Sequence, residues 1–323
     1  MRTSGATLVR VCTAGLALIG AATFQQTLGA GSGERPRPTY SNVTYGAHPH
    51  QILDVWKCGK AGRRPVVVHF HGGAWVRGDK ADFQDAALYL AAGFSVVSVN
   101  YRFVWQARDA GVRPPVAWPM EDACRALQLV RYRADEWGFD PARIGAIGDS
   151  AGACLALWLA LHADMAEPSS TDPVRRQSTR LSGAALTGAQ TTLDPKEMRE
   201  WTPNSFYGGH AFGFVQTSNI LDMGDFAAFL SARNQILDQI QRYSPYALAG
   251  PAAPPLWLSY RAPPALGQKV EDPTHTANFG VRLQEKLRAA GVNCEVVYPG
   301  AEGPHAGSAL EFLAGILLPG TPP

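Results

Sequence analysis

The most constraining feature of the sequence is a short apolar run that ends in Gly148-Asp-Ser-Ala-Gly152 and passes directly into a helix-forming segment. A strand, a sharp turn and a helix in this order hold the central residue, Ser150, in a strained backbone conformation with its hydroxyl exposed. Gly148 and Gly152 lack the Cβ atoms that would keep strand and helix apart. An exposed serine hydroxyl becomes a nucleophile only beside a base, so the chain must also supply that base.

Buried strands alternate with helices along most of the chain. Residues 65–70, 95–100 and 143–147 are short runs, the first two rich in β-branched residues, as is typical of strands covered on both faces. Helix-forming segments, such as residues 80–92 and 120–137, lie between them. Repeated β-α-β units require a mostly parallel sheet with helices on both faces, so the pattern predicts an α/β fold.

Two departures from this alternation shape the expected domain. Residues 41–47 and 51–56 favour an antiparallel hairpin at one edge of the sheet. Residues 188–254 break the rhythm between the sixth and seventh expected strands and are rich in aromatic side chains. An excursion of this length predicts a cap-like insertion over the strand ends.

The N-terminus has the pattern of an export signal. Arg2 and Arg10 precede or flank an apolar stretch over residues 11–24, and small residues follow as far as Ala30. This predicts a signal peptide at residues 1–30, with a retained membrane anchor as the alternative. We then expect a flexible start at residues 31–39, a single domain at residues 40–323, and a secreted or periplasmic protein. The net charge of +2 equals the two leader arginines, so no nucleic-acid partner is expected.

The cysteines and histidines do not predict a metal or redox centre. Cysteines outside the leader lack C-x-x-C spacing, which leaves disulfides and buried free thiols as alternatives. His69 and His71 would point to the same side of a strand, but no carboxylate accompanies the pair. No metal and no cofactor are therefore predicted. The four cysteines are Cys58, Cys124, Cys154 and Cys294.

Four motifs together resemble the α/β-hydrolase family, in particular its secreted esterases with an HGG oxyanion loop, similar to acetylxylan and feruloyl esterases. They are His-Phe-His-Gly-Gly-Ala-Trp at residues 69–75, Gly-Asp-Ser-Ala-Gly at 148–152, Glu-Asp-Pro at 271–273 and Gly-Pro-His at 303–305. The resemblance extends over nearly all of the chain from residue 40. It implies the α/β-hydrolase fold.

The resemblance also implies a catalytic triad. Ser150 would be the nucleophile and Asp272 the acid that orients the base. His305 would be the base, because it follows the last expected strand, where this family has its histidine. His275, which lies in the acid loop, is the main rival to His305, and Glu271 is the alternative to Asp272.

Negative charge on the substrate's carbonyl oxygen requires hydrogen-bond donors that are in place before the reaction. By resemblance, the backbone N–H groups of Gly72, Gly73 and Ala151 form this oxyanion hole.

Aromatic rings near the site suit flat sugar or aryl groups. Trp75, Trp201 and Tyr207 are accordingly predicted to bind substrate. The alternative for the aromatic residues of the insertion is that they form its own small core.

The sequence thus predicts a serine carboxylesterase that works through an acyl-enzyme without a cofactor. The resemblance favours short-chain or aryl esters, acetyl or feruloyl, carried by a small molecule or a polysaccharide. An amidase-, formamidase- or peptidase-like hydrolase on the same triad is one alternative. An inactive hydrolase scaffold that acts as a binding protein is another. No stable membrane association is expected once the signal has been cleaved.

Overall fold

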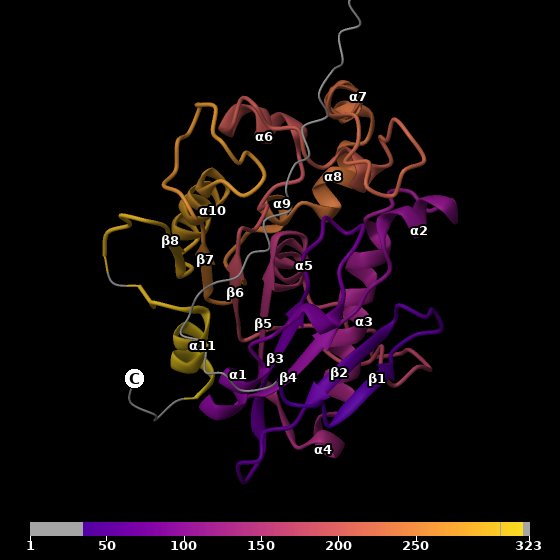
Figure 1. The fold of residues 1–323 in the computed structure, drawn as a ribbon, viewed down its shortest axis with the longest axis vertical. Helices are drawn as coiled ribbons and strands as arrows, with labels where there is room; N and C mark the ends of the chain where they lie inside the picture. Colours follow the sequence, from indigo (N-terminus) through magenta and orange to yellow (C-terminus); the bar gives the residue numbers. More distant parts are fainter. Residues whose placement is uncertain (1–34, 304, 319–323) are drawn as a thin grey trace, which may run out of the picture. The chain divides into compact units, whose positions relative to one another are not determined.

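A computed structural model, which describes residues 35–318 apart from residue 304, contains one eight-stranded sheet (Figure 1). Its strand order is β1-β2-β4-β3-β5-β6-β7-β8. The hairpin strands β1 and β2 are antiparallel, β2 is antiparallel to β4, and all other neighbours are parallel. The strands are β1 (Tyr40–Thr44), β2 (Ile52–Trp56), β3 (Arg64–Phe70), β4 (Ser95–Val99), β5 (Phe139–Asp149), β6 (Gly183–Thr187), β7 (Leu256–Ser259) and β8 (Cys294–Val297).

Helices cover both faces of this sheet, as the alternation predicts. Strand residues such as Val67, Ile147 and Trp257 pack in one cluster with α1 (Ala86–Ala92) and α11 (Ala309–Leu317). Their strand neighbours point the opposite way because side chains alternate along a strand. They pack in the larger cluster, which also contains α3 (Ala117–Tyr132), α5 (Ser150–Leu161) and α10 (Ala277–Ala289).

Helix α5 is the most deeply buried helix of the fold. Every residue from Ala151 to Leu161 is buried, and only Ser150, at its start, is partly exposed. A helix that is apolar on all sides must be covered by other elements all round, and α5 contacts β3, β5, β6 and α3. The nucleophile candidate is therefore attached to one of the most rigid parts of the molecule.

The segment between β6 and β7, where the sequence predicts an insertion, contains several short helices. Figure 1 shows α6, α7 and α8 together beyond one end of strands β5, β6 and β7. Its elements are α6 (Pro195–Trp201), η2 (Gly209–Phe212), α7 (Phe226–Ala232), η3 (Arg233–Gln235), α8 (Leu237–Tyr243) and α9 (Pro245–Leu248). The short helices α2 (Val104–Asp109) and α4 (Ala134–Trp137) lie outside it.

The helix expected over residues 80–92 is split in two. Asp79 caps the short turn η1 (Lys80–Asp82) through a capping box, which satisfies the free amides of a single turn. Phe83 then adopts an extended conformation, and its ring stacks on His69 with a centroid distance of 4.5 Å. Packing of this one ring thus interrupts a segment whose composition favours a continuous helix.

The remaining predictions, on the N-terminus, membrane helices, metal sites and cysteines, can be compared with the structure only over the residues that it describes. The predicted signal peptide and most of the flexible start lie outside them. Within them, no helix has the length and apolar character needed to cross a membrane, and no three His, Cys, Asp or Glu side chains gather as a metal site. The four cysteines outside the leader are all free thiols, which decides between the two alternatives left by the sequence.

Candidate active site

The strained turn predicted around Ser150 is present at the junction of β5 and α5. Ser150 has a φ of 49°, a left-handed value that is unfavourable for a side chain other than glycine. A Cβ on Gly148 would lie 2.7 Å from the carbonyl carbon of Gly152, and a Cβ on Gly152 would collide with the carbonyl oxygen of Phe70. Both glycines are therefore required by the close approach of strand and helix.

The hydroxyl of Ser150 meets a histidine that is itself bound to a carboxylate. Ser150 Oγ lies 2.9 Å from His275 Nε2, and His275 Nδ1 lies 2.8 Å from Asp272 Oδ2. Because an ionised carboxylate only accepts hydrogen bonds, Nδ1 carries the ring proton and Nε2 presents its lone pair to the serine hydroxyl. A serine, a histidine that can take its proton, and an acid that orients the histidine are thus connected in one chain of hydrogen bonds.

The prediction that His305 meets Ser150 is wrong in this structure. His305 is exposed in the loop between β8 and α11. Its neighbour Ala306 is held by two contacts, donating its N–H to Glu295 Oε2 at 2.9 Å and accepting from Trp257 Nε1 at 3.0 Å. Trp257 packs on the face of the sheet that α11 covers, whereas α5 and Ser150 belong to the other face. His275 occupies the position because its own loop leads directly into α10 on the α5 face.

Asp272, rather than the alternative Glu271, makes the contacts expected of the acid. Its carboxylate also accepts the backbone N–H groups of Thr274 and His275, each at 3.1 Å. Burial raises the pKa of Asp272, but the hydrogen bond and charge of His275, together with these amides, outweigh it and hold the pKa below its ordinary value. Asp272 therefore remains a carboxylate at neutral pH and continues to orient the ring.

The loop after β3 lies against the start of α5, so the structure brings the predicted oxyanion residues to the serine turn. Tyr101 Oη donates to the carbonyl oxygen of His71 at 2.7 Å, and the two rings stack with centroids 4.3 Å apart. Gly73 has a φ of 102°, and its carbonyl oxygen accepts the N–H groups of Val76 and Arg77. These contacts fix the glycine backbone in place before any ligand arrives.

Asp149 is a charged residue of the site that the sequence did not single out. Its carboxylate lies against Gly72, where a Cβ would collide with Oδ2. Burial raises the pKa of Asp149, although a hydrogen bond from the Gly72 amide and the charge of His275 act in the opposite direction. Asp149 thus lies directly beside Gly72, one of the predicted oxyanion residues.

The prediction that Trp75, Trp201 and Tyr207 bind substrate does not agree with the burial of their rings. Trp75 is fully buried, and its Nε1 donates to the carbonyl oxygen of Ala151 at 3.0 Å. Tyr207 is 4% exposed and packs beside Trp75, with ring centroids 5.9 Å apart. Trp201 is 6% exposed and packs edge-to-face on Tyr246. All three are core residues of the large cluster that also contains residues of β3, β5 and α5, so the insertion's aromatic residues join the main core rather than forming one of their own.

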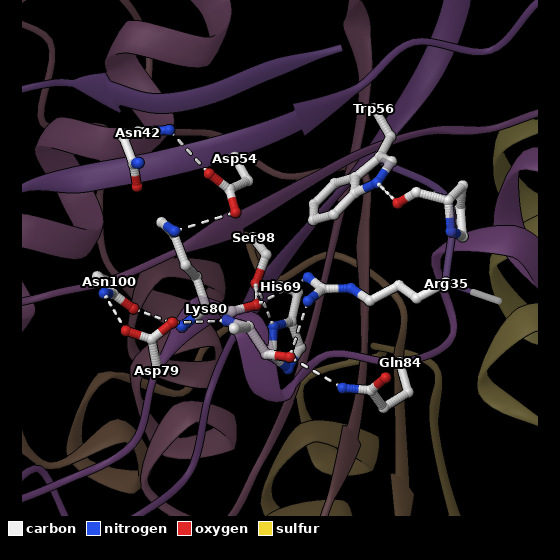
Figure 2. Close-up of polar contacts among 12 residues, drawn as sticks. Arg35, Asn42, Asp54, Trp56, His69, Asp79, Lys80, Gln84, Ser98 and Asn100 are labelled. Carbon is white, nitrogen blue, oxygen red and sulfur yellow. Dashed lines mark hydrogen bonds and ion pairs between the residues drawn. The ribbon is translucent and has the colours of Figure 1, made fainter. Parts of the chain in front are cut away.

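A buried polar network fixes the segment that follows the glycine loop (Figure 2). Lys80 Nζ pairs with Asp54 at 3.0 Å, and the backbone N–H of Lys80 donates to Asn100 Oδ1 at 2.5 Å. Ser98 Oγ donates to the carbonyl oxygen of Lys80 at 2.9 Å and lies 2.9 Å from His69 Nδ1. His69 therefore has its imidazole in this network, and no metal role is needed to account for it.

Comparison with known proteins agrees with the fold. A family model described as BD-FAE matches residues 53–205, which include the glycine loop and the serine turn. Among solved structures, esterase 2 of Thermogutta terrifontis, phosphonylated by sarin, covers 86% of this chain and 88% of its own, with a TM-score of 0.60 and 22% identity. An acetyl ester-xyloside bifunctional hydrolase from Caldicellulosiruptor lactoaceticus covers 82% of both chains, with a TM-score of 0.55 and 20% identity. The chain therefore has the α/β-hydrolase fold.

The similar curated proteins are named as esterases. Esterase LipC of Mycobacterium tuberculosis is 34% identical over 128 residues, which are 38% of this chain and 30% of that protein. Carboxylesterase NlhH of the same species is 38% identical over 100 residues, which are 30% of this chain and 28% of that protein. The chain thus matches about a third of the length of these relatives.

Proposed function

We propose that this protein is a serine carboxylesterase in which Ser150, His275 and Asp272 form the catalytic triad. The observation that carries the proposal is the unbroken chain of hydrogen bonds from the serine hydroxyl through the imidazole to the carboxylate. His275 takes the proton of Ser150 as its oxygen attacks the ester carbonyl, and then protonates the departing alcohol. Water repeats the sequence on the acyl-enzyme and releases the acid.

The negative charge on the carbonyl oxygen is held by backbone amides at the meeting point of two elements. Ala151 is in the first turn of α5, where amide groups have no partner within the helix. Gly73 belongs to the loop that packs on this turn, and Gly72 supports it through its contact with Asp149. Losing one such donor typically costs about 10²- to 10³-fold in rate.

The experiment that tests the triad compares two histidine variants. We expect His275→Ala to lower kcat for p-nitrophenyl acetate by about 10⁴-fold or more, as loss of a triad base does. His305→Ala is the matched control and should leave kcat near the wild-type value. A larger loss from His305→Ala would restore that residue as the base, whereas esterase activity retained in Ser150→Ala would reject the serine mechanism.

The nucleophile can also be identified with a covalent probe, without knowing which ester the enzyme prefers. The structurally similar esterase 2 of Thermogutta terrifontis is phosphonylated by sarin, which is the behaviour of an activated nucleophile. A fluorophosphonate probe should therefore label this protein at Ser150, as read by peptide mass spectrometry. Labelling should be lost in Ser150→Ala and strongly slowed in His275→Ala. A wild-type protein that is folded but not labelled would support the inactive binding-protein alternative.

For the substrate, we propose short-chain or aryl esters, acetyl or feruloyl, carried on polysaccharide. The support is the resemblance to acetylxylan and feruloyl esterases and the structural similarity to the acetyl ester-xyloside bifunctional hydrolase of Caldicellulosiruptor lactoaceticus. Release of acetate from acetylated xylan and of ferulate from methyl ferulate, measured beside p-nitrophenyl butyrate and an acetyl anilide, separates the candidates. Export through residues 1–30 is part of the same proposal and is tested by fractionating cells that express the full chain.

A further inference from the structure

The loop that carries both Asp272 and His275 is poorly covered by the rest of the protein. The side chain of His275 is 38% exposed and that of Asp272 is 59% exposed. Charge interactions at such exposure are screened by water and contribute little to holding a loop in place. Some other contact must therefore keep His275 Nε2 within hydrogen-bond reach of Ser150.

Gln190 supplies such a contact from the segment that follows β6. Its side chain is fully buried, and Nε2 donates to the carbonyl oxygen of Thr274 at 2.9 Å and to that of Gly188 at 3.2 Å. Thr274 directly precedes His275, so the amide holds the peptide plane that leads into the base. The other amide atom, Oε1, is buried and has no hydrogen-bond partner among the described residues. An unpaired buried oxygen costs free energy that an apolar side chain of the same size would avoid. The two hydrogen bonds that Nε2 donates are therefore the reason for an amide at this position.

The segment from which Gln190 reaches is itself firmly held. The N–H of Gly188 donates to the carbonyl oxygen of Ser259 at 2.8 Å, and Tyr260 Oη donates to the carbonyl oxygen of Ala189 at 2.9 Å. Gly188 also limits the ring from one side, because a Cβ there would lie 3.3 Å from His275 Cδ2. This segment thus lies beside the ring of the base and, through Gln190, holds the backbone before it.

We propose that Gln190 is a positioning residue that sets the distance between His275 and Ser150 by holding the Thr274 carbonyl. The proposal rests on the proposed triad. It does not require Gln190 to touch substrate. An isosteric loss of the amide, Gln190→Met, should lower kcat by about 10- to 100-fold, since a displacement near 1 Å costs that much in a reaction that depends on close alignment. KM should stay near the wild-type value.

Thr191→Val is the matched control for general damage. Thr191 is equally buried and also donates to backbone of the same region, but its partner is the Phe279 carbonyl oxygen inside α10, at 2.8 Å. Both variants should lower the melting temperature by comparable amounts, yet only Gln190→Met should lose kcat. Equal losses of kcat in the two variants, or a Gln190→Met enzyme with at least half of wild-type kcat, would overturn the proposal.

Gln190→Glu provides a readout that a purely structural role would not move. A carboxylate facing two carbonyl oxygens repels them, whereas its protonated form can donate one hydrogen bond to Thr274. The ratio of kcat in Gln190→Glu to kcat in Gln190→Met should therefore rise as pH falls. A ratio that is independent of pH would contradict the proposal. His275→Ala, assayed in parallel, tests the triad separately: if it retains kcat, the triad assignment fails whatever Gln190 does.

Discussion

A quantitative prediction concerns the stability of the fold toward acid, and it depends on His69 in the network behind the glycine loop (Figure 2). Burial lowers the pKa of His69 from its ordinary value of 6.5 to about 3, with smaller contributions from the charges of His71 and Arg35. Ser98 Oγ gives its own proton to the Lys80 carbonyl oxygen, so it accepts from His69 Nδ1. The folded protein thus holds His69 neutral, while the unfolded chain binds a proton there below pH 6.5.

The sign follows from where the proton binds. Between pH 6.5 and about 3 the unfolded state holds more protons than the folded state, so the free energy of unfolding falls as pH falls. One pKa unit corresponds to about 1.4 kcal/mol, so His69 removes about 3 kcal/mol by about pH 4.5 and at most about 5 kcal/mol at lower pH. Above pH 6.5 it has no such effect, because the side chain is neutral in both states.

Gln in place of His69 keeps a polar side chain beside Ser98 but cannot be protonated in this range. His69→Gln should lower the free energy of unfolding at about pH 8, because stacking on Phe83 is lost. Between about pH 8 and about pH 4.5, however, its free energy of unfolding should fall by about 3 kcal/mol less than that of wild type. Urea unfolding followed by circular dichroism at both pH values measures the difference. His305→Gln, at an exposed histidine, is the control and should run parallel to wild type. Parallel curves for wild type and His69→Gln would refute the reasoning.

Two further predictions concern the contacts that support the glycine loop. Trp75→Phe removes the hydrogen bond to the Ala151 carbonyl oxygen and should lower kcat by about 10-fold with little change in KM, a partial form of losing one oxyanion donor. Trp105→Phe is the control, because it removes a similar indole hydrogen bond, from α2 to the Val76 carbonyl oxygen of the glycine loop, and should leave kcat unchanged. Equal losses of kcat in the two variants would mean that the role of Trp75 is only structural. Lys80→Met leaves the carboxylate of Asp54 buried without its partner and should cost about 3 kcal/mol in the free energy of unfolding. Adding Asp54→Asn should recover part of this loss, as measured by denaturant titration. A double variant with a lower free energy of unfolding than Lys80→Met would contradict a stabilising buried ion pair between Lys80 and Asp54.

Most of the fold could be predicted from the sequence because its elements follow from local patterns. The apolar β-branched runs over residues 65–70 and 95–100 correspond to β3 and β4, and the glycine-flanked turn holds Ser150 in the expected strained conformation, with a left-handed φ. These features depend on hydrogen bonding and steric contact within a few residues, or on simple burial of both strand faces. The split of the helix at residues 80–92 could not be predicted, because it depends on Phe83 stacking on the His69 ring of β3.

The sequence favours His305 as the base, whereas the structure brings His275 to Ser150. The position of the His305 loop after the last strand is an argument from order along the chain. The spacing of Asp272 and His275 is the better guide, because residues three apart in a turn before a helix can pair directly. The role of Gln190 had no sequence pattern at all, since a single amide shows its purpose only once the two carbonyl oxygens around it are known.

The short spacing between acid and base also separates two requirements of the chemistry. The hydrogen bond between Asp272 and His275 is local to one loop, so a shift of the whole loop preserves it and with it the tautomer of the ring. The bond between His275 and Ser150 joins residues 125 positions apart and is lost as soon as the loop moves. A loosened loop should therefore give an enzyme with a normal pH profile and a low kcat, whereas loss of Asp272 disturbs the ring itself. A contact that reaches the loop from outside it, such as that of Gln190, supplies this constraint.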